Sequence, residues 1–425
     1  PLDDVDADTL LRHADQAMYL AKQAGRNRIH WFDVANDRQV QTSQQTLARI
    51  KKALKNNELC LYYHPKVNMR SGSIVGMEAL LRWQHPEKGL VPPMEFLPLA
   101  EQDDLIIEIG EWVIEQALQQ TARWSATGKD WPISVNIAAR HFQLPNFLDR
   151  LQAILARHPE SPPQQLEIEI LESVTLGDIQ HVQQLIYACQ ALGIRFSLDD
   201  FGTGYSSLSY LKRLPANTLK IDQSFVRDML DDHDDLAMIE AIINLAASFN
   251  RAVVAEGVET AEHGVMLMRL GCDIGQGYGI ARPMPAAQVM EWAAQFTPDR
   301  KWQQWADAKK WNIDDFPLLV AEYDHLAWIK QVLDTVANPT PQNHYSLTDD
   351  ELTDHHLCRF GRWYYSHGQA RYGHLVEFTA LEPIHAEVHR IGTQIMHLHS
   401  TGQQAAAQAL CQSLLTLKNN IVNLL

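Results

Sequence analysis

Two adjacent carboxylates, Asp199 and Asp200, end an apolar run and are followed at once by a glycine-rich segment, in the stretch IRFSLDDFGTGYSSL (194–208). Neighbouring side chains of an extended strand point to opposite faces. Both aspartates can therefore serve one site only where the strand ends and its pleat is disrupted. Carboxylate oxygens gathered at such a strand end are suited to holding divalent cations.

Polar residues also stand at or near the ends of neighbouring apolar runs. They are Glu78, Asn136, Glu169, Lys220, Glu256 and Gln276. The acidic and amide side chains on four of the runs offer only oxygen ligands, which Mg²⁺ or Mn²⁺ prefer. These four are Glu78, Asn136, Glu169 and Asp199. Without a metal, carboxylates gathered in a cleft would repel one another and their pKa values would rise.

Asp200 gives this set a route to a second ion, with Asp199 as the bridge between the two metals. Two ions a few ångströms apart can activate a water and stabilise the leaving oxygen of an in-line phosphoryl displacement. Lys220 adds a cation that can orient the water or balance charge on the phosphorane. Any single residue of the set can instead be a surface carboxylate that caps a helix. The same placement on seven consecutive strands indicates a site.

Eight short apolar runs, which alternate with helical stretches between residues 51 and 296, are expected to position these residues. The runs are 59–65, 73–83, 132–139, 165–173, 195–202, 217–222, 252–259 and 272–279. Eight strands with helices between them predict an α/β fold, a (β/α)8-type barrel of about 250 residues. In such barrels the chemistry lies at the C-terminal ends of the strands.

The remaining regions have different residue patterns. Residues 1–33 predict one helix and one short strand, which cannot close a core of their own, and residues 34–50 predict a linker helix. Residues 297–316 are charged, rich in Trp, and compatible with a linker or docking helix. Residues 317–425 are mostly helical by their pattern, with repeated His and aromatic residues.

Composition limits the classes of function. A net charge of −16 argues against coating nucleic acid or an anionic membrane, so we expect no binding to DNA or RNA duplexes. We find no apolar run long enough to span a bilayer and no signal peptide. The 5 cysteines are odd in number and scattered, which favours a reducing cytoplasmic setting. Because the chain begins at Pro1, we expect a fragment or a processed product.

Five ordered motifs carry a family resemblance. They are EALLRW (78–83), DDFGTGYSSL (199–208), LKID (219–222), AEGVE (255–259) and GCDIGQGYGIARPMP (271–285). The region from about Lys51 to Phe296 resembles the EAL domain, a modified TIM-type barrel. That family hydrolyses the bacterial messenger cyclic di-GMP to the linear dinucleotide pGpG. Many such proteins have lost catalysis and act as receptors, but here every matched metal and catalytic position is retained.

The resemblance implies roles for residues of this chain. The implied Mg²⁺ or Mn²⁺ ligands are Glu78, Asn136, Glu169, Asp199 and Asp200. The implied catalytic residues are Lys220, Glu256, Asp200, Gln276 and Glu172. The implied substrate-binding residues are Arg82, Leu80, His64 and Asp200. Glu172 matches the glutamate that steadies a loop joining substrate, metals and dimer interface, and we expect a homodimer.

Two positions depart from the family pattern. YYHP places His64 where a substrate-contacting glutamine is usual, and EILES places Leu171 where a threonine is usual. Neither change removes a metal ligand. Both are expected to affect substrate affinity or loop behaviour.

The N-terminal stretch ADQAMYLAKQAGRNRIHWF (14–32) resembles the tail of a GGDEF domain, the fold that makes the same messenger. It covers only the last helix and strand of such a domain. The signature loop and nucleotide-binding residues are absent from this chain, so we expect no synthesis of cyclic di-GMP by it.

The C-terminal region raises a separate metal question. HAEVH places His385 and His389 four residues apart, on one face of a helix, as metal-ligand pairs require. Cys358 and His325 could complete a closed tetrahedral Zn²⁺ site. The alternative is an incidental pair, because the chain has 19 histidines.

The order of these residues resembles the chemoreceptor zinc-binding (CZB) domain, a small helical bundle that binds zinc through three His and one Cys. The resemblance covers about 316–423 and carries its ligands onto His325, Cys358, His385 and His389. Such domains sense zinc, or oxidants through the metal-bound thiolate, and regulate an attached module. A zinc-held thiolate stays deprotonated and can be oxidised.

Together these features predict a cytoplasmic cyclic di-GMP phosphodiesterase regulated by zinc. Two alternatives remain open on sequence grounds, a non-catalytic cyclic di-GMP receptor and a zinc-responsive interaction protein whose barrel is only a scaffold. A third, two-metal hydrolysis of another phosphodiester, is disfavoured by the motif order.

Overall fold

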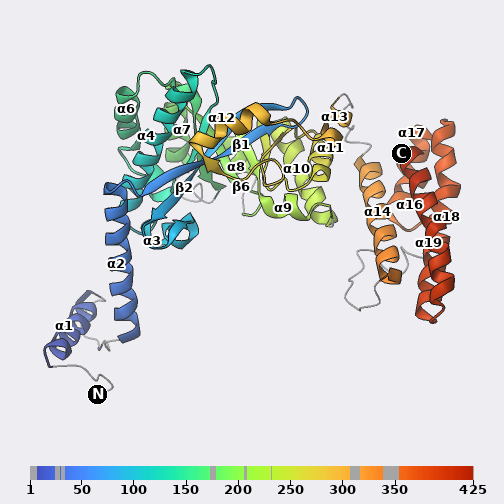
Figure 1. Cartoon of the computed structure of the whole chain (residues 1–425), viewed down its shortest axis with the longest axis horizontal. Coiled ribbons are helices and arrows are strands. Elements are labelled where there is room, and N and C mark those ends of the chain that lie inside the picture. Colours follow the sequence, from blue (N-terminus) through green and yellow to red (C-terminus); the bar gives the residue numbers. More distant parts are fainter. Residues whose placement is uncertain are drawn as a thin grey trace.

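The computed structural model describes residues 7–23, 29, 34–172, 179–204, 208–230, 232–306, 316–337 and 354–424. Figure 1 shows the helices α1 (Ala7–Gln23) and α2 (Val34–Lys55) at one end, a barrel in the middle, and a helical domain at the other end. The helix predicted in 1–33 is therefore confirmed. Residues 34–50, predicted as a linker helix, are helical and belong to α2, which runs five residues further, to Lys55. The short strand predicted after α1 lies outside the described residues apart from Ile29.

Eight strands close the barrel, and each falls within or overlaps one of the eight predicted runs. They are β1 (Leu59–Asn68), β2 (Ser73–His85), β4 (Ile133–Asn136), β5 (Leu166–Leu171), β6 (Arg195–Phe201), β7 (Thr218–Ile221), β8 (Ala252–Ala255) and β9 (Ile274–Gly275). Two short strands, β3 (Gly89–Val91) and β10 (Met284–Pro285), pair with β2 and β1, respectively. The predicted barrel fold is confirmed.

The first strand differs from a regular (β/α)8 barrel. β1 runs antiparallel to both of its barrel neighbours, β2 and β9, whereas the other seven strands run parallel. Only residues 69–72 join β1 to β2. So short a connection permits a hairpin but not the crossover that parallel strands need. Gly72 adopts a φ of 70° in this turn, where a side chain would be strained.

Helices between the strands cover the barrel, and α3 (Leu97–Ala100) and α5 (Ala139–Phe142) are single turns. The longer helices are α4 (Leu105–Ser125), α6 (Phe147–Arg157), α7 (Ile179–Ala191), α8 (Leu208–Arg213), α9 (Gln223–Asp228), α10 (His233–Ser248), α11 (Ala261–Leu270) and α12 (Ala286–Gln295). Strand residues such as Ile133, Phe196 and Leu219 are fully buried beneath them. This burial on both faces explains why the strands read as continuous apolar runs.

A further helix, α13 (Arg300–Trp305), is docked on the barrel. The Trp302 side chain is 3% exposed, and its Nε1 donates a hydrogen bond to the Ala261 carbonyl (2.8 Å). A Cβ at Gly264 would lie only 2.2 Å from that nitrogen, so the fit requires glycine there. Arg70 also donates to the carbonyl of Ala306 (2.8 Å). The described part of the predicted linker is therefore a docking helix, and residues 307–315 lie outside the described residues.

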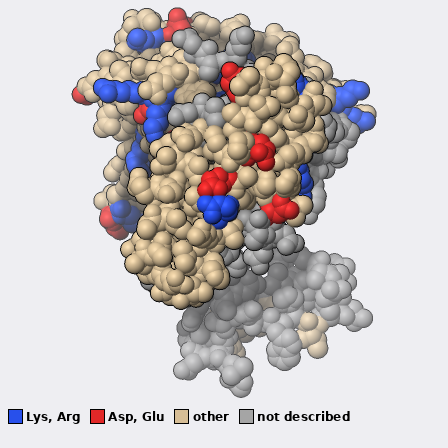
Figure 2. Space-filling model, turned by 90° about the vertical axis from the view of Figure 1, so that its right-hand side faces the viewer, with Lys and Arg blue, Asp and Glu red and all other residues tan. Residues whose placement is uncertain are grey.

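The C-terminal domain is helical, as predicted. It comprises α14 (Phe316–Ala337), α16 (Arg359–Trp363), a π-helical turn (Tyr364–Gly368), α17 (Gln369–Tyr372), α18 (Val376–Ser400) and α19 (Gln404–Leu424). Trp328, Val388 and Leu414 lie in its apolar core. Figure 2 faces this end of the molecule and shows scattered charges of both signs on a mainly uncharged surface. Among the described helices, we find none with the length and apolar character needed to cross a bilayer.

Candidate active site and metal centres

Strand register brings the predicted polar residues to one end of the barrel. Glu78 pairs with Ser134 of the next strand, and Asn136 pairs with Glu169. Asn136 ends β4, while Glu256 and Gln276 directly follow β8 and β9. Glu78 was expected near a strand end but lies inside β2, because β2 continues to His85 in its pairing with β1 and β3. Its parallel pairing in the barrel ends one residue later, at Ala79.

The adjacent aspartates occupy a disrupted strand end, as their spacing predicts. Asp200 adopts a φ of 52°, and the ladder between β6 and β7 shifts register between Leu198 and Phe201. This backbone kink breaks the alternation of side chains. Oxygen atoms of Asp199, Asp200 and Glu256 consequently lie within 4.8 Å of one another. A second acidic group, Glu78, Glu169 and Asp199, meets the same criterion, so Asp199 belongs to both.

Lys220 stands at the centre of these carboxylates and is 1% exposed. Its Nζ lies 2.6 Å from Glu169, 2.6 Å from Glu256 and 2.9 Å from Asp199. Burial disfavours the ammonium, but Glu169 and Glu256 outweigh it and raise the pKa of Lys220 well above its usual value. Lys220 is therefore a fixed positive charge inside the site.

Three carboxyl groups of the site have pKa values above their usual range in the absence of metal. Burial raises the pKa of Glu78 to about 7, with Glu169 adding to the shift. Burial also raises the pKa of Glu256 to about 8, and that of Asp200 to about 6 with help from Asp199. Burial opposes ionisation of Glu169 too, but Lys220 outweighs it and lowers the pKa of Glu169. A divalent cation would relieve this excess of acidic groups, so the oxygen-only donor set fits Mg²⁺ or Mn²⁺.

Lys66, in β1, is a second buried cation that sequence reasoning missed. Its Nζ donates to Glu169 (2.8 Å) and Ser134 (2.8 Å) and lies 3.4 Å from Glu167. Lys66 thus fixes the Glu169 oxygen that does not face Lys220. Lys66 directly follows the predicted apolar run 59–65, and nothing local in the sequence shows that it is buried.

His64 and Gln276 form a buried chain to Glu78. The Gln276 Nε2 donates to His64 Nδ1 (2.8 Å) and to Glu78 Oε2 (2.5 Å). The His64 Nε2 lies 2.9 Å from the Ala281 carbonyl, so a neutral His64 with its proton on Nε2 satisfies both contacts. Burial lowers the pKa of His64 to about 4, in keeping with that neutral form. Asn136 Nδ2 donates to the other oxygen of Glu78 (2.8 Å).

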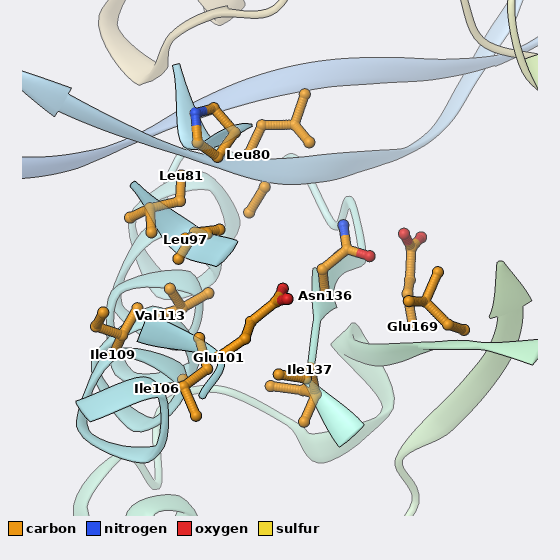
Figure 3. Close-up of a pocket in the computed structure, with 15 residues that line it drawn as sticks. Leu80, Leu81, Leu97, Glu101, Ile106, Ile109, Val113, Asn136, Ile137 and Glu169 are labelled. Atoms are coloured by element: carbon orange, nitrogen blue, oxygen red, sulfur yellow. The ribbon is translucent and has the colours of Figure 1, made fainter. Parts of the chain in front are cut away.

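Two cavities of about 260 Å³ each border the acidic cluster. The first is lined by charged groups that include Glu78, Asp199 and Glu256, together with the predicted substrate-binding residues His64, Leu80 and Arg82. The second also borders Leu80 but is mostly apolar (Figure 3). Figure 3 shows the carboxylate of Glu101 pointing toward the side where Asn136 and Glu169 lie. Sequence reasoning missed Glu101. Asp200, also predicted to bind substrate, lines neither cavity among those described.

Glu172 contacts the glycine-rich segment, as its predicted role requires. Its carboxylate accepts a hydrogen bond from the Gly202 N–H (3.2 Å). A Cβ at Gly204 would lie 2.8 Å from the same carboxylate, so glycine permits the close approach. Residues 205–207 of the segment lie outside the described residues.

The helical domain brings its four predicted zinc ligands together. His325 comes from α14, Cys358 precedes α16, and His385 and His389 are on α18. All four are at most 5% exposed, and their ligand atoms lie within 4.8 Å of one another. The Cys358 sulfur is 3.3 Å from His385 Nε2 and 3.9 Å from His325 Nε2. The Nε2 atoms of His325 and His389 are 3.2 Å apart.

These separations fit one tetrahedral zinc ion. Zn–N bonds of about 2.05 Å and a Zn–S bond of about 2.3 Å place two nitrogens roughly 3.3 Å apart, and sulfur and nitrogen roughly 3.6 Å apart. Burial, together with His325, lowers the pKa of His385, which favours the neutral imidazole that a metal needs. The residues present therefore suit a closed Cys–His₃ site.

Comparison with known protein families divides the chain in the same way, into a barrel and a helical zinc-site domain. The EAL domain family matches residues 47–283, more than half of the 425 residues, and the chemoreceptor zinc-binding domain family matches residues 325–396. The chain is 44% identical over 282 residues to the bifunctional diguanylate cyclase/cyclic di-GMP phosphodiesterase MucR of Pseudomonas aeruginosa. It is 37% identical over 292 residues to the cyclic di-GMP phosphodiesterase PdeR of Escherichia coli. These alignments cover 66% and 68% of this chain but 41% and 44% of the two relatives.

Solved structures of EAL proteins also match this chain. The P. aeruginosa MucR phosphodiesterase in complex with c-di-GMP is 45% identical, with a TM-score of 0.56, and the match covers 58% of this chain and 99% of that one. The EAL enzyme Bd1971, in a form bound to cAMP and cyclic di-GMP, is 31% identical, with a TM-score of 0.58, and the match covers 68% and 77% of the two chains.

Proposed function

Because this chain belongs to the EAL-domain family and also carries a chemoreceptor zinc-binding domain, we propose that its barrel hydrolyses cyclic di-GMP to linear pGpG under the control of zinc. The observation that carries the proposal is the convergence of oxygen ligands around Lys220. Those ligands are Glu78, Asn136, Glu169, Asp199 and Asp200. Bound Mg²⁺ or Mn²⁺ ions supply Lewis-acid activation of water and of the phosphodiester.

The chain's own residues complete the chemistry. Lys220 and Glu256, 2.6 Å apart, hold the attacking water beside the acidic cluster. The fixed charge of Lys220 offsets the negative charge that grows on the phosphorane. Gln276 and His64 hold Glu78 in one orientation, and Glu172 holds the glycine-rich segment close to Asp200.

The two cavities suit the two chemical parts of the substrate. Arg82 lies in the charged cavity, where its guanidinium can pair with a phosphate. The apolar cavity can hold a nucleobase between side chains such as Leu97 and Val113. Guanine presents N1–H and N2–H donors on one edge, and the Glu101 carboxylate is an acceptor in the same cavity. Leu80 borders both cavities and separates base from phosphate.

The test is turnover with a matched control. The protein with Mn²⁺ or Mg²⁺ should convert cyclic di-GMP to pGpG, measured by chromatography. Glu169→Gln should abolish conversion while Glu87→Gln, at an exposed carboxylate, should not. Binding of cyclic di-GMP without any pGpG would show a receptor and overturn the proposal. If Glu78→Ala leaves the zinc-dependent function of the protein unchanged, the barrel is only a scaffold.

We further propose that zinc held by Cys358 and its three histidines sets the rate of the barrel. The support is adjacency, since α13 is docked on the barrel and α14 carries the first zinc ligand, His325. A zinc-held thiolate would also let an oxidant act through Cys358. The working form is proposed to be a cytoplasmic homodimer, and residues 1–33 to be the tail of a GGDEF domain.

Titrating zinc while pGpG release is followed tests this regulation. The rate should change as the Cys358 site fills and should not respond in Cys358→Ser. A rate that stays flat through filling of the site would remove the regulatory claim without touching the hydrolysis claim.

A further inference from the structure

The buried zinc site has no ligand on the surface. His325, Cys358, His385 and His389 are 5%, 2%, 1% and 2% exposed. A hydrated ion approaching from solvent cannot meet these atoms first. An outer group that takes up the ion and removes part of its water shell would ease its entry.

A second cluster with metal-ligand chemistry lies on the surface side of this site. Ligand atoms of Asp354, His355 and His356 all lie within 4.8 Å of one another. The side chains of Asp354 and His356 are 49% and 54% exposed, and that of His355 is 21% exposed. The trio therefore spans the distance from solvent to a partly buried position.

The outer cluster contacts the buried site directly. The ring centroid of His355 is 5.6 Å from that of His385 and 6.5 Å from that of His389. The Cys358 thiol lies 3.4 Å from the His355 carbonyl. Glu382, which stands three residues before His385 on α18, lies 3.5 Å from His355 Nε2. Glu382, His385 and His389 thus follow one face of that helix from solvent to the buried site.

Each outer histidine has a carboxylate partner. The Nδ1 of His356 lies 2.9 Å from an Asp354 oxygen, so these two ligand atoms are close enough to bind one ion together. His355 faces Glu382, whose carboxylate also accepts a hydrogen bond from the Tyr365 hydroxyl (3.0 Å). A carboxylate such as Glu382, which is not itself a ligand of the proposed site, fixes the tautomer of a metal-binding histidine and raises its basicity. Asp354 also accepts from the His356 N–H, so it forms a local turn as well.

We propose that Asp354, His355 and His356 form an outer divalent-metal site that captures Zn²⁺ and passes it to Cys358, His385 and their partners. Nitrogen and oxygen ligands without a thiolate hold zinc more weakly than the buried set, so transfer inward is downhill. The negative charges of Asp354 and Glu382 raise the local concentration of cations. This inference rests on the buried set being the zinc site of the helical domain.

Loading kinetics of the full chain test the transfer step. The metal-free protein is mixed with Co²⁺, and the thiolate-to-cobalt absorption band reports arrival at Cys358. His355→Ala/His356→Ala should slow the appearance of the band, because the captured ion loses both imidazole ligands of the outer site. The final amplitude should be unchanged. The control His374→Ala/His397→Ala, which removes two exposed histidines elsewhere, should load at the wild-type rate.

Equilibrium binding supplies an independent readout. Cys358→Ser/His389→Ala, checked for folding by circular dichroism, should keep one weak equivalent of Zn²⁺. Adding His355→Ala/His356→Ala should remove it. The outer-site proposal would be overturned if the wild type, His355→Ala/His356→Ala and the control variant load at equal rates, or if His355→Ala/His356→Ala reaches a smaller final amplitude. It would also be overturned if Cys358→Ser/His389→Ala retains no equivalent of Zn²⁺. Absence of the thiolate band from the wild-type protein would instead refute the buried site.

Discussion

At the scale of single residues, the barrel end is organised by two buried lysines among acidic groups. Lys220 contacts Glu169, Asp199 and Glu256, and Lys66 contacts the other oxygen of Glu169. Removing one partner of a buried ion pair is costly because it leaves an uncompensated charge. The same contacts fix the carboxylate oxygens before any metal arrives.

Lys66→Met should therefore lower the free energy of unfolding by about 3–5 kcal/mol, because Glu167 and Glu169 lose a buried partner. Urea unfolding measures the change. The control is Lys51→Met, which breaks an ion pair with Glu108 of similar length (2.7 Å) whose two side chains are half-exposed. This variant should lose about 1 kcal/mol or less. Equal losses would show that Lys66 is not part of a buried network.

Metal binding should depend on pH because three carboxyl groups of the site have raised pKa values. The pKa values of Asp200, Glu78 and Glu256, about 6, 7 and 8, mean that each group binds a proton below its value. A divalent cation must displace those protons, so its affinity should rise from pH 6 to pH 8 by about tenfold per unit for each proton displaced. Calorimetry with Mn²⁺ in two buffers measures affinity and proton release. A pH-independent affinity without proton release would contradict this account.

Sequence reasoning found the residues whose signal is local. The pair Asp199–Asp200 can share a site only where a strand breaks, and the left-handed Asp200 provides that break. It missed Lys66 and Glu101, because their partners lie on other strands and helices. A buried lysine or a carboxylate facing a cavity has no neighbouring residues that reveal it.

At the scale of elements, all eight strands could be predicted, but the direction of the first could not. Apolar runs report burial, and they say nothing of which strand pairs with which. The four-residue connection between β1 and β2 was the available signal for the hairpin. The docked helix α13 was predicted only as one of two options, since its Trp residues suit either a linker or a packed face.

Trp302→Ala should destabilise the barrel by about 3–5 kcal/mol, because a buried indole and its hydrogen bond to Ala261 are lost. Urea unfolding followed by circular dichroism measures this. Lys301→Ala, on the same helix, breaks only an exposed ion pair with Glu262 and should cost about 1 kcal/mol or less. If both variants behave alike, α13 is a tether and not part of the barrel.

At the scale of the whole molecule, the chain separates two kinds of metal chemistry. The barrel offers carboxylate and amide oxygens, whereas the helical domain offers a thiolate and three imidazoles. Hard and borderline-soft cations are therefore sorted by ligand type. Under the proposed regulation, this sorting would keep a zinc signal separate from Mg²⁺ or Mn²⁺ in the barrel.

Removing zinc with a thiol- and nitrogen-type chelator should lower the unfolding temperature of the helical domain and leave the barrel transition in place. The reason is that zinc bound at the proposed site would join α14, α16 and α18 through His325, Cys358 and His385. Scanning calorimetry of the full chain separates the two transitions. Cys358→Ser should mimic chelation, and a chelator that shifts both transitions equally would contradict the separation.

The central claim is that oxygen ligands from separate strands close around a pair of hard cations next to the messenger. Anomalous scattering from crystals grown with Mn²⁺ and cyclic di-GMP tests it most directly. We predict two manganese peaks bridged by Asp199, one bounded by Glu78, Asn136 and Glu169 and the other by Asp200, with the phosphodiester beside Lys220. Crystals that hold the dinucleotide but show no manganese among these residues would contradict the account.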